Sequence, residues 1–550
     1  MSQEQLFIGG VVLFVIALLL FIKVNGDIQL KKSVRNAQGK FPRVVAGRDT
    51  EKSLKEAFKQ SSTGENQVEI DDLTWNDLDM FTVFQMINQT FSSIGSENLY
   101  QRMRKYGLDQ DFSQLEELIT FLSEHPKEKE DLQWAFAKLG KKDYNAVQSY
   151  LKEPKKQQLG NPWSFLFLGI LPIIGLIMLF FNALGLLVLI FSVPFNVVFY
   201  FRKKNQMETE LLSMGYLVQT ILCGKNMKKI TQPTQEKIKE NLRPLEKITR
   251  FAFSFSVKTN TDGDLFMEYF NMIFLLPFIS YNFVLGILQN HQKEAQALWQ
   301  LLGDLEAASA ILNFREIMPY ATQPTFQKEL QVHAKDVYHP LLKEPVVNDI
   351  DWTKNTLITG SNASGKSTYV KGVAINCLLA QTIHTTLAEQ FSLPHSLVIS
   401  SMALEDNIFA GESYFIAEIK SVKRIIDHVK KGVPTLCFID EILKGTNTIE
   451  RIAASSSIVA WLADHGALSF VATHDIELTE ILKKQCANVH FSESVNKKGV
   501  FFDYKLKDGP AKTRNALALL KVLKYPAEIV TAAQNEASSF EEQRAWREID

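Results

Sequence analysis

The stretch NTLITGSNASGKST, Asn355–Thr368, decides the fold of this chain. A short β-prone run ends in Gly360, and after four intervening residues Gly365-Lys366-Ser367 opens a helix-prone segment without proline. This spacing is the phosphate-binding loop pattern G-x-x-x-x-G-K-[ST], placed between a strand and a helix. Its glycines let backbone N–H groups turn toward phosphate oxygens, and the helix N-terminus adds positive potential. The stretch therefore predicts a nucleotide-phosphate site.

Each residue type in the loop has an expected task. Lys366 would reach the terminal phosphates, and the Ser367 hydroxyl would bind Mg²⁺. A glycine turn before a helix that happens to carry a lysine is the plainer alternative, and two downstream motifs argue against it. The predicted nucleotide-binding residues are Gly360, Ser361, Asn362, Ala363, Ser364, Gly365, Lys366, Ser367 and Thr368.

Two further strand-like runs supply the second half of an ATPase site. TLCFIDE at 435–441 ends in Asp440 and Glu441, and SFVATH at 469–474 ends in His474. Asp440 would hold Mg²⁺ through water, and Glu441 would position or deprotonate the attacking water. His474 would hydrogen-bond the γ-phosphate, the alternative being a surface histidine at a strand end. The predicted activity is hydrolysis of ATP with Mg²⁺, with Glu441, His474 and Lys366 as catalytic residues.

Length and composition bound the class of protein. A chain of 550 residues is too long for one core, so several domains are expected. The net charge of −1 gives no global reason to bind nucleic acid. Four scattered cysteines without CxxC spacing fit a reducing compartment and argue against zinc.

Three apolar stretches bear on membrane insertion. Leu6–Ile22 is uncharged and followed by basic residues, which favours an uncleaved membrane helix over a signal-peptide core. Trp163–Phe201 is uncharged, about two spans long, and flanked by basic residues, so it predicts a hairpin of two membrane helices. A further crossing by residues 270–288 would put the phosphate loop outside the cell, so these residues are expected to form a buried helix. The predicted location is the cell membrane, multi-pass, with a cytoplasmic ATPase domain.

We expect a multidomain chain of α and α/β type, because strands alternating with helices after about Val346 predict a parallel sheet. The expected divisions are a transmembrane helix at 1–23, a linker at 24–67, the first part of a helical core domain at 68–160, a transmembrane hairpin at 161–204, the rest of the helical core at 205–345 and a P-loop ATPase domain at 346–550.

Residues 346–550 resemble the MutS mismatch-repair ATPases, which belong to the ABC-type class. ITGSNASGKST resembles the family's ITGPNMGGKST, and ATHDIEL is similar to its ATHYHEL. DEILKGTNTIER resembles DE-x-x-RGT-S-T, with Lys444 where arginine is usual and Asn447 where serine is usual. GESYF at 411–415, with Glu418, is similar to the family's SxF-x-x-E signature.

This signature implies a dimer. In the family its serine completes the γ-phosphate site of the partner subunit, and the matching position here is Ser413. The resemblance thus implies two ATPase domains meeting face to face, as a homodimer of this chain. A weaker resemblance of residues 88–104 and 303–316 to the MutS core helical domain implies that the membrane hairpin interrupts that domain.

The chain departs from the family at its N-terminal side, where a membrane helix and linker stand in place of a mismatch-reading domain. The first hypothesis is a membrane-anchored MutS-like ATPase that couples hydrolysis to a partner such as DNA, with DNA binding implied by resemblance alone. The alternative is an ATP-switched membrane scaffold or regulator that binds no DNA. A transporter with fused ATPase heads is disfavoured, because its membrane helices would be few and poor in polar residues.

Overall fold

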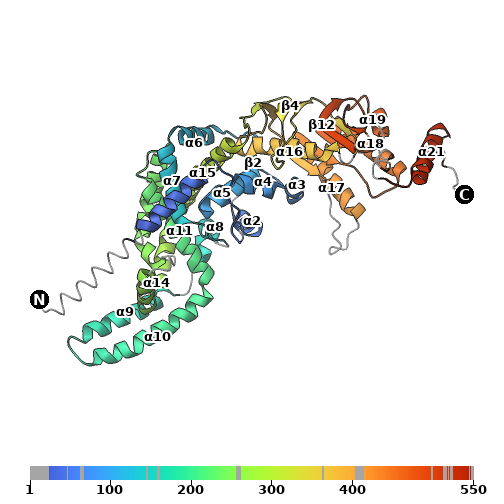
Figure 1. Ribbon diagram of the computed structural model, residues 1–550. Coiled ribbons are helices and arrows are strands. Elements are labelled where there is room, and N and C mark those ends of the chain that lie inside the picture. Colours follow the sequence, from blue (N-terminus) through green and yellow to red (C-terminus); the bar gives the residue numbers. More distant parts are fainter. Residues whose placement is uncertain are drawn as a thin grey trace. The chain divides into compact units, whose positions relative to one another are not determined.

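The computed structural model (Figure 1) describes residues 21, 24–45, 47–61, 67–143, 146–157, 161–255, 262–361, 364–402, 414–496, 499–511, 517, 520, 524–543 and 546. Nearly all of the predicted first membrane helix, and also Ser413, Asn362 and Ala363, lie outside these residues. The chain forms two compact units. Residues 1–65, 85–102 and 111–317 make up the helical unit, and residues 66–84, 103–110 and 318–550 make up the sheet unit.

The sheet unit is larger than the predicted ATPase domain of residues 346–550. It also takes in residues 318–345 and two segments from the N-terminal third of the chain. The chain passes from one unit to the other at α4 (Met80–Ile87) and α5 (Ser93–Arg104).

Helices build the described part of the helical unit, and they include α2 (Glu51–Gln60), which falls within residues 24–67, where the sequence predicts a linker. They also include α6 (Ser113–Glu124), α7 (Pro126–Leu139), α8 (Val147–Lys152), η1 (Pro154–Gln157), α9 (Pro162–Met178), α10 (Leu184–Gln206), α11 (Glu208–Met227), α12 (Gln235–Leu242), η2 (Arg243–Phe255), α13 (Asp262–Phe274), α14 (Leu276–Asn290) and α15 (Gln292–Ile317).

A buried carboxylate joins α15 to the start of α5. Glu306 of α15 is 1% exposed and accepts hydrogen bonds from the backbone N–H groups of Phe91 and Ser92 and from the Ser92 hydroxyl. These are unpaired donors at a helix N-terminus, where a negative charge is also favoured. A Cβ at Gly95 would lie 2.2 Å from Glu306 Oε2, so only glycine lets the carboxylate approach.

Helices α9 and α10 form an antiparallel hairpin with apolar faces (Figure 1). A Cβ at Gly185 would lie 2.4 Å from Leu179 N, so glycine permits the tight approach at the tip. Midway along α10 the fully buried Asn196 donates to the carbonyl oxygens of Leu168 in α9 and Ile273 in α13, at 2.8 Å each. The outer surface carries exposed large apolar side chains such as Phe167, Phe181, Leu187, Phe191 and Phe195.

Among the described residues, α10 by itself is long and apolar enough to cross a membrane, while α9 is apolar but shorter. Residues 267–290 would count as a second span only if taken as one helix bent by 77°. The bend falls at Leu275, whose φ is +53°. Beyond it α14 buries Phe278, Tyr281 and Val284 completely, and the Tyr281 hydroxyl donates to that of Tyr150 at 3.0 Å. Helix α14 is thus a buried helix of the helical unit.

The sheet unit contains a six-stranded sheet in the order β12-β11-β6-β10-β9-β8 and a four-stranded sheet in the order β3-β7-β4-β5. Its strands are β3 (Thr325–Gln327), β4 (Val332–Val337), β5 (Asn348–Trp352), β6 (Thr356–Thr359), β7 (Gln390–Pro394), β8 (Leu397–Ser401), β9 (Thr435–Asp440), β10 (Ala467–Ala472), β11 (Ala487–Asn496) and β12 (Gly499–Asp508). Its helices are α16 (Lys366–Ile383), α17 (Tyr414–Val429), α18 (Thr448–Asp464), α19 (Glu477–Ile481) and α21 (Ala527–Gln543). Strands β6, β8, β9, β10 and β11 run parallel, which confirms the mixed α and α/β architecture.

The outer edge of β8 is covered by a segment we call the N-terminal strap, residues 67–84 and 103–110. The strap contains β1 (Gln67–Glu69), α3 (Asp72–Asp77) and β2 (Lys105–Gly107). Backbone N–H groups of three alternating residues, Val398, Ser400 and Met402, donate to strap side chains: the hydroxyls of Tyr106 and Thr74 and the carboxylate of Asp77. An edge strand otherwise exposes such donors as a template for unwanted pairing, so the strap completes the sheet.

Candidate nucleotide site

The predicted phosphate loop has the backbone that its glycines require. Strand β6 runs into Gly360 with φ +137°, and Gly365, with φ +98°, precedes α16. A Cβ at Gly360 would also lie 2.7 Å from the carbonyl oxygen of Phe491. Both positions therefore favour glycine, and the loop delivers the first residues of α16, Lys366 to Thr368, to one end of the sheet.

Lys366 is folded back on its own loop. Its Nζ donates to the carbonyl oxygens of Gly360 and Ser361, at 2.7 and 2.8 Å, and its side chain is 2% exposed. Burial lowers its pKa to about 8, although the negative charges of Asp440, Glu441 and Glu493 act in the opposite direction. A buried ammonium held by carbonyls alone gains from a nearby anion.

The sheet register brings the acidic pair to the same edge. In the parallel β9–β10 pair Asp440 lies opposite Ala472, and Ala472 lies opposite Ile358 of β6. Because parallel strands end at one edge, Asp440, the last residue of β9, lies at the same edge as the phosphate loop, and Glu441 and His474 follow the ends of β9 and β10. The negative charges of Asp440 and Glu441 act on the pKa of Lys366, and His474 contacts Glu441, so these four side chains lie near one another.

Glu441 is held by two basic side chains. Its Oε1 lies 2.9 Å from His474 Nε2, and its Oε2 lies 3.2 Å from Lys444 Nζ. Burial alone would raise the pKa of Glu441, but these two partners outweigh it and the pKa lies below the ordinary value. Its backbone is left-handed, φ +62°, and its N–H donates to Ala472 O at 2.9 Å. His474 therefore contacts Glu441, a contact that the strand pattern did not reveal.

Neighbouring groups fix His474 in turn. Thr473 N donates to Ile358 O, and Thr473 Oγ1 accepts from Asp475 N. Arg451 of α18 forms a two-bond ion pair with Asp475, at 2.6 and 2.8 Å. The segment after β10 is thus tied on one side to the central strand and on the other to α18.

A second carboxylate connects α17 to the loop after β9. Glu418 is 5% exposed and accepts from the backbone N–H groups of Lys444 and Gly445, at 2.9 and 3.2 Å. Gly445 packs on Phe415, since a Cβ there would lie 3.1 Å from Phe415 Cβ. The signature match contained Glu418, but its sequence context did not reveal this role.

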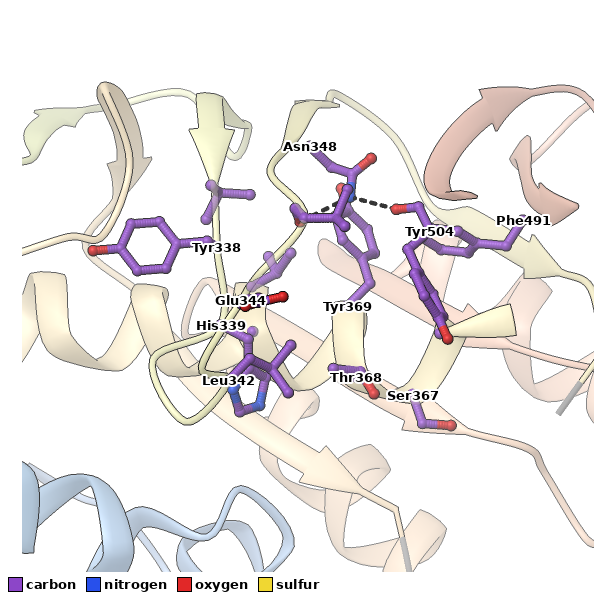
Figure 2. Close-up of a pocket in the computed structure, with 15 residues that line it drawn as sticks. Tyr338, His339, Leu342, Glu344, Asn348, Ser367, Thr368, Tyr369, Phe491 and Tyr504 are labelled. Carbon is purple, nitrogen blue, oxygen red and sulfur yellow. Dashed lines mark hydrogen bonds between the residues drawn. The ribbon is translucent and has the colours of Figure 1, made fainter. Parts of the chain in front are cut away.

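A cavity of about 510 Å³ lies beside the start of α16 (Figure 2). Gly365, Ser367 and Thr368 form part of its wall, and the ring of Tyr504 lies next to them. His339 also lines it, and burial, with the charge of Lys371 adding to the effect, lowers the pKa of His339 to about 4. The imidazole is therefore neutral near pH 7. The other lining residues are Val337, Tyr338, Leu342, Glu344, Val346, Asn348, Tyr369, Gly372, Val373 and Phe491.

The available donors fit Mg²⁺ held mainly by phosphate and water. No group of three or more His, Cys, Asp and Glu side chains in the described ranges could hold a metal ion. The loop instead offers the Ser367 hydroxyl, and β9 offers the Asp440 carboxylate. Hard oxygen donors in small number are what Mg²⁺ uses when a nucleotide supplies the remaining ligands.

The glycine turn between β6 and α16, with an acidic pair at the end of β9, belongs to an α/β domain whose central strands run parallel. Residues 356–541 match the family model of MutS domain V. The DNA mismatch repair protein MutS of Listeria innocua is 26% identical over 356 residues, 62% of this chain and 38% of that protein. The DNA mismatch repair protein MutS of Thermus thermophilus is 24% identical over 342 residues, 60% of this chain and 41% of that protein. Residues 356–541 are thus similar to the ATPase region of the MutS family, and the chain spans less than half the length of these curated relatives.

Proposed function

We propose that this chain is a membrane-anchored ATPase of the MutS type that binds and hydrolyses ATP with Mg²⁺ in a dimer of two ATPase domains. The observation that carries the proposal is the grouping of Lys366, Asp440 and the Glu441–His474 pair at one edge of a parallel sheet. Ligands of open α/β sheets bind at this edge. The family match supports ATP binding by the same domain.

Nucleotide binding uses groups that are already in place. A phosphate would replace the carbonyls of Gly360 and Ser361 as the partner of the Lys366 ammonium. The nucleoside would occupy the neighbouring cavity, whose volume lies within the usual range for small-ligand sites. Tyr504 offers an aromatic face there, and the neutral imidazole of His339 offers a hydrogen-bonding edge.

Hydrolysis falls to Glu441. Its ionised carboxylate would orient or deprotonate the attacking water, while His474 and Lys444 hold its two oxygens in place. Mg²⁺, when bound, would offset phosphate charge, with the Ser367 hydroxyl as a direct ligand and Asp440 holding it through water. Glu441 thus does the chemistry, and its two neighbours position it.

Dimer formation is the next part of the proposal. Helix α17 begins directly after Ser413, the residue that the family resemblance assigns to the partner's γ-phosphate. Ile416 and Ile419, three residues apart on one face of α17, are 43% and 39% exposed. Glu418, between them in sequence, ties the helix to the loop that follows Glu441. A partner docking on α17 would therefore act directly on the hydrolytic loop.

The variant Glu441→Gln tests the site and the dimer together. With full-length protein in lipid nanodiscs, we expect the ATPase rate to fall by about 100-fold or more, because the base is lost. ATP should still bind and should trap a dimer, measured by light scattering of detergent-solubilised protein. Glu480→Gln, on an exposed carboxylate of α19, is the matched control. An unchanged rate would refute the catalytic role, and a monomer with ATP bound would refute the dimer.

Membrane anchoring rests on the hairpin of α9 and α10, whose apolar outer faces are exposed in the helical unit. The same feature favours a second candidate function, an ATP-switched membrane scaffold that binds no DNA. Duplex DNA titrated onto full-length protein in nanodiscs separates the two. Binding that weakens steeply with salt supports a DNA partner. No binding at low salt, with the ATPase rate changed by lipid but not by DNA, supports the scaffold.

A further inference from the structure

The helical unit contains a cavity of about 410 Å³ where the apolar hairpin ends. It lies between the last turns of α10, the first half of α11, the end of η2 and α13. The polar and charged side chains that line it include Lys142, Lys204, Glu208, Glu268 and Asn271.

An acceptor in the wall of this cavity lacks a donor. Asn271 of α13 is 7% exposed, and its Oδ1 accepts no hydrogen bond from any residue that the structure describes. Its Nδ2 is used, donating to the carbonyl oxygen of Ser254 at 3.4 Å. A buried acceptor without a partner destabilises the folded protein. Asn271 therefore calls for an N–H or O–H donor from a molecule in the cavity.

The charges in the wall are balanced. Lys204 and Glu268 form an ion pair of 2.9 Å, and Lys142 and Glu208 also line the cavity. An anionic ligand would lie near two carboxylates and a cationic ligand near two ammonium groups. A zwitterionic ligand instead has an oppositely charged side chain for each of its charged groups. The apolar remainder, with Leu211, Phe255 and Pro277, suits a hydrocarbon portion.

We propose that this cavity binds the headgroup of a phospholipid that carries a primary ammonium, as ethanolamine lipids do. The inference rests on the membrane insertion of α9 and α10 proposed above. The phosphate lies toward Lys204 and Lys142, and the ammonium donates to Asn271 Oδ1 beside Glu208 and Glu268. A choline headgroup has no N–H to give, so the cavity distinguishes two zwitterionic lipids of otherwise similar charge.

Lipid retention by the full-length protein tests the proposal. Protein is extracted from vesicles of equal ethanolamine, choline and glycerol phospholipids, and native mass spectrometry counts the lipids retained. We expect the ethanolamine lipid to be enriched at least fivefold over the choline lipid. Successive N-methylation of the headgroup should abolish the enrichment when the last N–H is lost, a measurement that needs no protein variant.

Protein variants locate the effect. Asn271→Leu removes the acceptor and should lose the enrichment, whereas Asn271→Asp keeps an acceptor and should retain it. Asn290→Leu, at an exposed amide of α14 that donates to Gly286 O in its own helix, is the control and should behave as the wild type. If the protein stays in membranes after alkaline extraction but retains all three lipids equally, this inference is wrong and the proposed membrane anchor stands. Release by alkaline extraction would overturn both.

Discussion

Glu306 shows how a single buried carboxyl can make a helical unit sensitive to pH. Burial raises its pKa from 4.5 to about 7, against the lowering effect of the hydrogen bonds from Ser92 and Phe91. The folded state then binds more protons than the unfolded chain between those two pH values, so stability falls as pH rises through this window. The stabilisation by the protonated form is fully present below pH 4.5 and is lost on passing about pH 7.

We therefore expect the region around α5 to be more stable at pH 5 than at pH 8, by on the order of 3 kcal/mol from this group. Hydrogen-exchange mass spectrometry of peptides covering residues 88–104, corrected for intrinsic pH effects, measures it. Glu306→Gln should flatten the pH dependence, while Asp304→Asn, on a partly exposed carboxyl paired with Arg102, should leave it unchanged. Equal slopes in the wild type and Glu306→Gln would contradict the assignment.

At the scale of elements, the contact between α17 and the loop after β9 links the signature region to hydrolysis. Glu418→Gln keeps the shape of the side chain but sets an amide N–H₂ against one of two backbone donors. Losing one charge-assisted bond of about 1.5–3 kcal/mol should slow turnover by about 10- to 100-fold. The KM for ATP should change little, because Lys366 and the cavity are untouched.

Steady-state kinetics of full-length protein measure this split between kcat and KM. Asp427→Asn, on an exposed carboxylate of the same helix, is the control and should match the wild type. A rise in KM with normal kcat would show that Glu418 serves nucleotide binding instead.

The strap over β8 is the second element with a measurable consequence. Tyr106→Phe removes a hydroxyl that accepts from Val398 N and donates to Ser396 O, at 3.1 and 3.0 Å. Leaving these buried groups unpaired should destabilise the sheet unit by about 1–3 kcal/mol. Thermal unfolding followed by Trp352 fluorescence checks it, with the exposed Tyr525→Phe as the control.

A fragment of residues 346–550, which lacks the strap, should aggregate through the open edge of β8.

These elements also separate what the sequence could predict from what it could not. The phosphate loop, the strands ending at Asp440 and Ala472, and the apolar hairpin follow from local spacing and composition. The strap does not, because its contacts are polar side chains meeting a strand some 300 residues later, and local periodicity carries no information about such a partner. The left-handed backbone at Glu441 and Leu443 could not be predicted from the sequence either, because neither residue is glycine and tertiary contacts impose the conformation.

For the whole molecule, the proposed membrane insertion of α9 and α10 predicts on which side of a membrane each segment lies. All four native cysteines are buried, so they should react little with an impermeant maleimide. Labelling of a single introduced cysteine can therefore be measured against a low background. Asn182→Cys at the hairpin tip should label in intact cells. Lys59→Cys, before the hairpin, and Lys483→Cys, in the sheet unit, should label only after permeabilisation, because a hairpin returns the chain to the cytoplasm.

The three positions together also decide the status of residues 267–290. Lys59 and Lys483 lie on the same side only if an even number of spans separates them. If they label from opposite sides, the bent pair of α13 and α14 crosses the membrane as a third span, against the burial of Phe278 and Tyr281 in the helical unit. If Asn182→Cys also needs permeabilisation, the hairpin does not cross at all. ATP is available in the cytoplasm and scarce outside, so only the even arrangement supplies the proposed nucleotide site with its substrate.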